Sequence, residues 1–326
     1  MKALLNSLDD LLNDTVILGY DRIGYALRQP LWDPEETDVD MSGKVCVVTG
    51  ANSGLGYATA RALAHKGARV IMACRSEQRG TEAQQKLMAT TGNVNIELEL
   101  VDLSRPEDVR AFVERLRTRY PSLDVLINNA GALFNHREET PEGFEKTFAT
   151  DLLGPYLLTR LLIPLLEKAP ESRIINVSSG GMYFGKLHVE DLQFKKRPYN
   201  GPMAYAEAKR GLMILTQLWA KALEHSNITV NAMHPGWADT PGVASSLPGF
   251  RQLTRWVLRT HEEGADTIVW LAVKPDLQAS GRFFFDRKPR EVYRLPSTRS
   301  SLSEIEQFWQ YLGELTDGAE PFPYGY

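Results

Sequence analysis

Tyr205 and Lys209, four residues apart, are the two side chains of this sequence best suited to acid–base chemistry. In a helix, this spacing puts both side chains on one face. A free phenol titrates near a pH of about 10, so bringing it to neutrality means favouring the phenolate by roughly 4 kcal/mol. A neighbouring ammonium group can supply part of that stabilisation. An isolated pair of this kind is usually an ordinary surface pair, so the rest of the chain must decide its meaning.

A glycine-rich turn stands between a strand pattern and a helix pattern in the first part of the chain. Glycines at such a turn let the backbone approach a pyrophosphate, and the helix amides that follow point toward it. The turn lies inside a strand–helix–strand unit, so it indicates a dinucleotide site more strongly than a lone glycine triplet would. The glycines are Gly50, Gly54 and Gly56, with a strand over 44–48, a helix over 57–66 and a second strand over 69–73.

Five motifs that occur in order give the chain a resemblance to the short-chain dehydrogenase/reductase family, from about residue 43 to residue 286. They are Thr49-Gly50-x-x-x-Gly54-x-Gly56, Asn128-Asn129-Ala130-Gly131, Ser179, Tyr205-x-x-x-Lys209 and Pro235-Gly236. A closer resemblance, to the sub-family of dehydrogenase/reductase member 12, rests on 234–242, 264–267, 280–284 and 286–289.

The resemblance implies a catalytic set of Ser179, Tyr205 and Lys209. Ser179 would donate to the substrate carbonyl, Tyr205 would transfer the proton, and Lys209 would lower the pKa of Tyr205 and bind the nicotinamide ribose. The alternative for Ser179 is that it caps a turn. Asp151 takes the place of the family's asparagine, which helps to hold a water beside the lysine. A carboxylate only accepts hydrogen bonds when ionised, so Asp151 would hold that water differently and could raise the pKa of Lys209.

Cofactor preference is indicated at the end of the second strand. Cys74 stands where the family has an acidic residue for the ribose of NAD, and Arg75 follows it. An arginine suits a 2′-phosphate by charge and geometry, which favours NADP(H) over NAD(H). Asp102 resembles an adenine contact, although it could equally cap a helix. The expected cofactor-binding residues are Gly50, Asn52, Ser53, Gly54, Leu55, Gly56, Arg75, Asp102, Leu103, Asn128, Ala130, Gly131, Tyr205, Lys209, Pro235, Gly236 and Thr240.

Composition limits the alternatives. With 326 residues, 43% hydrophobic and 24% charged, the chain can form a full core, and we expect one globular domain. A net charge of -4 makes nucleic acid an unfavoured partner. Cys46 and Cys74 are expected to fill the core, with no metal site and no disulfide. No apolar run approaches the length of a membrane span, so the expected location is the cytoplasm.

Strand and helix patterns alternate from residue 41 onward, which predicts a doubly wound α/β Rossmann fold with a parallel seven-stranded sheet. This domain would cover 41–289, between an N-terminal helical extension over 1–40 and a C-terminal tail over 290–326. Further strands are expected over 96–101, 123–128, 173–177, 228–233 and 281–285. Helices are expected over 107–119, over 141–167 with an interruption at Gly154-Pro155, over the Tyr205 segment to about 225, and over 303–314.

The N-terminal extension shows amphipathic helix spacing. Its polar face is acidic, whereas helices on anionic bilayers usually present lysine and arginine. We therefore expect its apolar stripes to pack on the enzyme's own body or on a partner subunit. Contact of residues 1–30 with a membrane is the less favoured alternative. The stripes consist of Leu4, Leu5, Leu8, Leu11 and Leu12, then Val16, Tyr20, Ile23 and Leu27.

Apolar residues in two segments, 180–204 and 237–260, favour a lipophilic substrate, although core packing explains the same residues equally well. The first segment carries Lys195, Lys196 and Arg197, which we expect on its solvent face. The sequence thus predicts an NADP(H)-dependent oxidoreductase that interconverts a ketone or aldehyde and an alcohol. The alternative is a nucleotide-binding scaffold or redox sensor without turnover. By resemblance, a homodimer through 141–167 and 203–225 is a further expectation.

Overall fold

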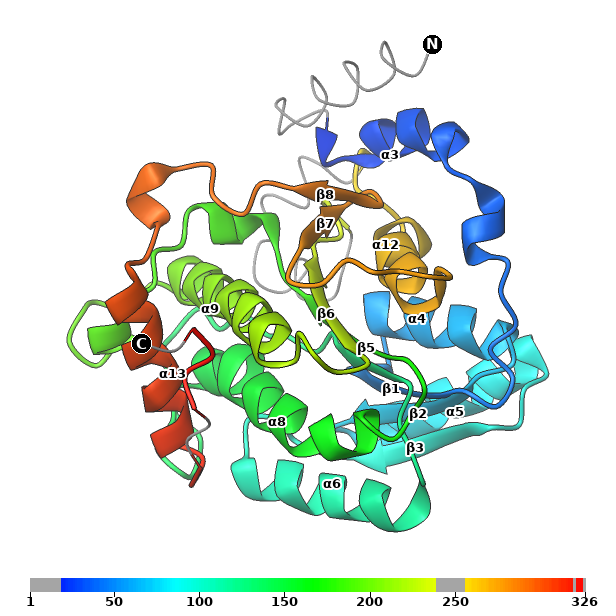
Figure 1. Cartoon of the computed structure of the whole chain (residues 1–326), viewed down its shortest axis with the longest axis horizontal. Coiled ribbons are helices and arrows are strands. Elements are labelled where there is room, and N and C mark those ends of the chain that lie inside the picture. The colour runs from blue at the N-terminus through cyan, green and yellow to red at the C-terminus, as the bar shows by residue number, and fades with distance from the viewer. Residues whose placement is uncertain (1–18, 239–255, 319–320, 325–326) are drawn as a thin grey trace.

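The fold, seen in a computed structural model, is a sheet between two layers of helices (Figure 1). The structure describes residues 19–238, 256–318 and 321–324. Strand order is β3-β2-β1-β4-β5-β6-β7-β8, with β1 to β7 parallel and β8 antiparallel to β7. The strands are β1 Val45–Thr49, β2 Arg69–Cys74, β3 Ile96–Leu100, β4 Val125–Asn128, β5 Ser172–Val177, β6 Ile228–Met233, β7 Phe283–Phe285 and β8 Lys288–Arg290. The predicted Rossmann fold is confirmed, and β8 is an eighth strand that the sequence did not indicate.

The order of the strands determines where a ligand can lie. From β1 the chain continues outward to β2 and β3, then returns to the other side of β1 for β4 and the strands after it. In open parallel sheets, the crevice at such a reversal lies outside the carboxyl ends of the strands and binds ligands. The central strands are almost completely buried because helices cover both faces. Their polar neighbours at the carboxyl ends are therefore the groups available to a ligand.

Helices α4, α5 and α12 cover one face of the sheet, and α6, α8, α9 and α13 cover the other (Figure 1). Each helical layer covers its own apolar cluster, because successive side chains along a strand point to opposite faces of the sheet. The helices are α4 Gly54–His65, α5 Glu77–Thr91, α6 Pro106–Arg119, α8 Gly154–Leu166, α9 Gly201–Ala222, α12 His261–Val273 and α13 Leu302–Glu314.

The long helix expected over 141–167 starts later and is not interrupted. It begins with α7, Lys146–Phe148, and passes through a π-helical turn, Ala149–Leu153, into α8. Pro155 lies in the first turn of α8, where the wider preceding turn accommodates its missing N–H. The stretch Lys146–Leu166 is also apolar and long enough to cross a bilayer, contrary to the expectation from the sequence. Because 72% of its most apolar window is buried, it serves here as a core helix.

The C-terminal tail contributes to the core rather than lying outside it. The predicted short helix is confirmed as α13, and Trp309 of that helix is 1% exposed. Its ring lies 5.6 Å from that of Tyr156 on α8 and 4.7 Å from that of Trp219 on α9, between ring centroids. Aromatic pairs at these distances add to the stabilisation from burial. Helix α13 thus covers part of the α8 and α9 surface (Figure 1).

The N-terminal extension is described from residue 19, so the stripe from Leu4 to Leu12 and Val16 lie outside the described residues. We expected the apolar stripe of helix α3, Arg22–Arg28, to pack on the body, but it faces the solvent. Ile23 and Leu27 are 49% and 48% exposed, whereas Tyr25 and Arg28 are buried. The polar groups of Arg28 find buried partners on the body, and those contacts decide which face turns inward.

Candidate active site

Ser179, Tyr205 and Lys209 come together at the carboxyl end of β5. Helix α9 begins at Gly201, and the side chain of its N-cap, Asn200, accepts from the amide of Met203. The Ser179 hydroxyl acts on the Tyr205 phenol and opposes the increase in its pKa. The Nζ of Lys209 lies 5.4 Å from the centroid of the Tyr205 ring. The three groups thus form one contact chain from hydroxyl to phenol to ammonium.

Ser179 also fulfils the alternative role that the sequence left open. Its Oγ accepts from the amide of Gly181 at 3.1 Å and begins the turn η4, Gly180–Tyr183. A hydroxyl oxygen has two lone pairs and one proton, so capping leaves the donor free to serve another acceptor. The turn consequently fixes the oxygen, and the hydrogen remains available for Tyr205 or a carbonyl.

Asp151 lies in the π-helical turn and is completely buried. Its Oδ1 accepts from the amide of Ala132 at 2.7 Å, and its Oδ2 lies 3.4 Å from Nζ of Lys209. A Cβ on Gly131 would lie 3.0 Å from that Nζ and 3.2 Å from Oδ2. The glycine therefore allows the ion pair to form directly, where the sequence suggested a bridging water.

The buried charges change one another's pKa values. Burial raises the pKa of Asp151 to about 6, against the opposing effect of the Lys209 ammonium. Burial disfavours the Lys209 ammonium, but Asp151 and Tyr205 together outweigh it, and the pKa of Lys209 is raised. Burial also raises the pKa of Tyr205, which Lys209 lowers and Asp151 raises further. The carboxylate therefore works against the effect that Lys209 has on the phenol.

The glycine-rich turn has the geometry expected of a phosphate cradle. Gly50 and Gly54 have φ of +66° and +56°, which favours glycine. A Cβ on Gly56 would lie 2.4 Å from the carbonyl oxygen of Gly50, so no side chain fits there. Within the described chain, the hydroxyl of Ser53 makes no capping bond to the first amides of α4. Those amides and the close backbone suit the pyrophosphate of a dinucleotide.

These features coincide with a family match, since the model for the short chain dehydrogenase matches residues 44–249. The chain belongs to the short-chain dehydrogenase family. It is similar to dehydrogenase/reductase SDR family member 12 of Bos taurus, with 44% identity over 91% of this chain and 93% of that protein. The sub-family resemblance inferred from the motifs is thereby confirmed.

Two further relatives extend the comparison. Retinol dehydrogenase 14 of Mus musculus is 39% identical, over 77% of this chain and 80% of that protein. The solved L-sorbose reductase of Gluconobacter frateurii, complexed with NADPH and L-sorbose, is 26% identical with a TM-score of 0.63. That alignment covers 76% of this chain and 96% of the reductase. The chain is accordingly a member of an oxidoreductase family that uses nicotinamide cofactors.

Arg75, directly after β2, is an exposed cation. Its side chain is 63% exposed, and its Nη1 lies 3.9 Å from Oδ2 of Asp102. Asp102 forms a turn by accepting from the amide and hydroxyl of Ser104, while Arg105 is the cap of α6. Leu103 is buried in the core. Arg75 and Asp102 therefore reach the solvent, whereas Leu103 does not.

Cys74 and Asn128 are buried at the carboxyl ends of β2 and β4. Burial raises the pKa of the Cys74 thiol to about 11, and the backbone of Ala51 and Asn52 in the glycine-rich turn opposes that increase. The amide of Asn128 donates to Asn176 at 2.8 Å and to Thr159 at 3.0 Å, and the residue is 1% exposed. Both cysteines are free and buried, as expected. No group that could hold a metal ion occurs in the part of the chain that the structure describes.

The two segments expected to shape the substrate site differ in what they expose. In the first, Leu187 and Phe194 are buried, while Phe184 is 66% exposed, five residues after Ser179. Arg197, expected in solvent, instead forms two contacts of 2.9 Å with the carboxylate of Glu207, because that buried carboxylate on α9 requires a cation. The second segment falls largely outside the described residues, Thr240 included, and Trp256 is 78% exposed.

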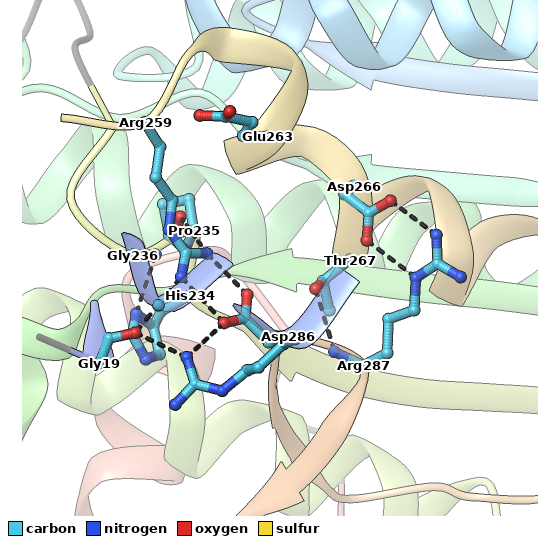
Figure 2. A network of polar contacts seen from close by, with 12 residues as sticks. Gly19, His234, Pro235, Gly236, Arg259, Glu263, Asp266, Thr267, Asp286 and Arg287 are labelled. Atoms are coloured by element: carbon cyan, nitrogen blue, oxygen red, sulfur yellow. Dashed lines mark hydrogen bonds and ion pairs between the residues drawn. The ribbon is translucent and has the colours of Figure 1, made fainter. Parts of the chain in front are cut away.

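Pro235 and Gly236 follow β6, beside a buried polar network that the sequence did not reveal (Figure 2). Both carboxylate oxygens of Asp286 accept hydrogen bonds from Arg259, at 2.6 and 2.8 Å. One of them also accepts from Arg28 at 2.8 Å. The signal for Asp286 was its place in the sub-family motif at 286–289. No sequence signal marked Arg28 or Arg259. Arg28 is 258 residues from Asp286, and no periodic pattern relates residues so far apart.

Proposed function

We propose that the protein is an NADP(H)-dependent oxidoreductase that interconverts a lipophilic ketone or aldehyde and its alcohol. The observation that carries the proposal is the contact chain of Ser179, Tyr205 and Lys209 beside the glycine-rich cradle. Bound NADP(H) would supply the hydride chemistry, as cofactors of this class do. The glycine-rich turn and Arg75 would hold its phosphates, and Lys209 its nicotinamide ribose.

In the reduction direction, the Ser179 hydroxyl donates a hydrogen bond to the substrate carbonyl, and Tyr205 donates the proton that the developing alkoxide takes up. In oxidation, the phenolate of Tyr205 removes that proton. Lys209 stabilises the phenolate electrostatically, and such preorganised charge is the largest contribution in many active sites. Asp151, paired with Lys209, raises the pKa of both the Lys209 ammonium and the Tyr205 phenol. It is a positioning residue, since its contacts go to Ala132 and Lys209.

Support for the cofactor and the substrate class comes from several sides. Arg75 offers an exposed guanidinium, which suits a 2′-phosphate and so favours NADP(H) over NAD(H). The L-sorbose reductase to which the chain is similar was solved with NADPH. Retinol, which appears in the names of relatives such as retinol dehydrogenase 14, is an apolar alcohol. The exposed ring of Phe184 near Ser179 offers apolar surface to such a substrate.

The experiment is NADPH oxidation with a panel of apolar and polar carbonyls by the wild type and Tyr205→Phe. The variant keeps the ring and loses the transferable proton, so we expect at least a ~100-fold loss of kcat with nucleotide affinity unchanged. Tyr324→Phe, at a 45% exposed tyrosine, is the control and should keep the wild-type rate. A wild type that binds NADPH yet reduces no carbonyl would support the alternative, a scaffold or redox sensor.

Partners and location complete the proposal. We propose a small lipophilic substrate, no nucleic acid partner and a cytoplasmic location. A homodimer through α8 and α9 remains a prediction, and α13 already covers the Tyr156 and Trp219 part of those helices. Sedimentation of the full chain tests it. Flotation with vesicles tests the less favoured membrane contact of residues 1–30.

A further inference from the structure

Tyr20, which precedes the family match at 44–249 in sequence, lies against the serine turn. The residue is 3% exposed, and its ring meets those of His234 and Phe285 edge-on, with centroids 4.6 and 4.8 Å away. A Cβ on Gly180 would lie 3.2 Å from the Tyr20 ring. Gly180 follows Ser179 immediately, so the ring limits where the backbone of the serine turn can lie.

The backbone of Tyr20 also holds the segment that follows β6. Its carbonyl oxygen accepts from the amide of Trp237 at 2.7 Å. A Cβ on Gly236 would lie 2.5 Å from the same oxygen, so only glycine allows this approach. The amide of Gly236 donates to Nδ1 of His234 at 3.2 Å. Burial and the surrounding arginines lower the pKa of His234 well below its usual value, so that nitrogen stays an acceptor.

The guanidinium of Arg28 fastens this segment to the body of the enzyme. It donates to the carbonyl of Gly19 at 2.7 Å and to Asp286 at 2.8 Å. Arg259 shares Asp286 and donates to the carbonyls of Asp21 at 3.0 Å and Pro235 at 3.4 Å. Figure 2 shows Arg259 reaching from its own segment toward Pro235, Gly236 and Asp286. One carboxylate therefore joins residues 19–28, the segment after β6 and the end of β7.

The strand order indicates which half of the cofactor this clamp faces. The glycine-rich turn follows β1, and Arg75 and Asp102 follow β2 and β3, on one side of the crevice. Ser179 and Pro235 follow β5 and β6, on the other side. A dinucleotide whose pyrophosphate lies at the β1 turn and whose adenosine lies toward β2 and β3 extends its other nucleoside over β5 and β6. That nucleoside is the nicotinamide half.

We propose that Tyr20 and Arg28 form a positioning part of the active site, a clamp that fixes the backbone of 235–237 against the nicotinamide half of the cofactor. The inference rests on the proposed function for the identity of the cofactor. That Arg28 and Tyr20 hold the Trp237 amide in place does not depend on the proposed function. The clamp makes part of the N-terminal extension necessary for nicotinamide binding, although it lies outside the strands and helices that form the cleft.

The test compares Arg28→Met with Arg22→Met. Both change an arginine of α3 to the same residue, but Arg22 is 57% exposed and pairs with Glu263 at the surface. In the nucleotide-free protein, hydrogen exchange of the Trp237 amide should be about tenfold faster in Arg28→Met than in the wild type. The affinity for NADPH should fall about tenfold, while that for 2′,5′-ADP, which lacks nicotinamide, stays the same. Arg22→Met should change none of the three.

Two results would overturn the clamp. One is unchanged exchange at Trp237 in a folded Arg28→Met protein, and the other is an equal loss of affinity for both nucleotides. If Arg28→Met does not fold, Arg28→Lys keeps the charge, loses the forked contacts, and should show the same selective loss at smaller size. A wild type that binds neither nucleotide would refute the proposed cofactor, while the exchange experiment would still decide the clamp.

Discussion

Asp151 and Asp286 are both buried aspartates that face cations, and they are held in opposite ways. Asp286 has two guanidiniums, with contacts of 2.6 to 2.8 Å on both carboxylate oxygens. Asp151 has one ammonium at 3.4 Å and one short backbone contact at 2.7 Å. Bidentate contacts at short distance hold a carboxylate in one geometry. A single long ion pair holds it less tightly, so the pKa of that carboxylate depends more on burial.

The surroundings of the two residues agree with this difference. Asp286 and Arg287 form the two-residue turn between β7 and β8, both with positive φ, of 50° and 60°. That combination belongs to type I′ turns, which prefer asparagine and glycine. The bidentate contact of Arg287 with Asp266, at 2.7 and 2.8 Å, helps to offset the strain. Asp151, by contrast, lies in a π-helical turn, a feature frequent at functional sites.

The largest expected effect is the destabilisation caused by Asp286→Ala. The change leaves the buried guanidiniums of Arg28 and Arg259 without their shared carboxylate, which should lower the free energy of unfolding by about 3–5 kcal/mol. Urea denaturation measures it. Glu262→Ala, which removes the partner of half-exposed Arg61, should cost less than about 1 kcal/mol. Equal losses in the two variants would show that the Asp286 cluster is no different from a surface pair.

Much of the fold, but little of this cluster, could be predicted from the sequence. The strands and the glycine-rich turn follow from local periodicity, and the resemblance supplied Ser179 and its partners. The pairing of Arg28 with Asp286 depends on tertiary contacts that no spacing encodes. The reversed face of α3 has the same origin, because the buried partners of Arg28 outweigh the apolar stripe of Ile23 and Leu27. Sequence periodicity predicts amphipathicity, not buried ion pairs.

The second expected effect is a change in the pH dependence of stability in Asp151→Asn. The pKa of Asp151 is raised from 3.8 to about 6 in the folded protein, so the native state binds its proton more tightly than the unfolded state. Wild-type stability therefore loses a contribution as pH rises from about 4 through about 6, on the order of 2 kcal/mol. Urea unfolding across that range should show the variant gaining stability relative to the wild type as pH rises. A constant difference would refute the raised pKa.

The third effect concerns catalysis by the same variant. The Asp151 carboxylate raises the pKa of both Lys209 and Tyr205, so its replacement by the neutral amide should lower both. The alkaline limb of carbonyl reduction, where Tyr205 must be protonated, should move to lower pH. The measurement is kcat/KM against pH with one accepted carbonyl, alongside Asp108→Asn as a control at a surface carboxylate of α6 outside the Tyr205 contact chain. Superimposable profiles for Asp151→Asn and the wild type would exclude Asp151 from the proton relay.

The smallest effect on stability should come from Arg75→Ala, and this sharpens the contrast between buried and exposed charge. The pair of Arg75 and Asp102 is long, at 3.9 Å, and Arg75 is 63% exposed, so its loss should change the free energy of unfolding by less than about 0.5 kcal/mol.

Arg75 makes one long contact with Asp102 and so remains available to a ligand, whereas Arg28 and Arg259 are committed to Asp286. Arg75→Ala should therefore weaken NADP(H) by about thirtyfold, the loss of a charge-assisted contact of roughly 2 kcal/mol, and leave NAD(H) nearly unchanged. Cys74→Asp combined with Arg75→Ala should reverse the preference, because a carboxylate can accept from the ribose hydroxyls. Equal wild-type affinity for NADP(H) and NAD(H), measured by titration, would show that the exposed guanidinium does not bind the 2′-phosphate.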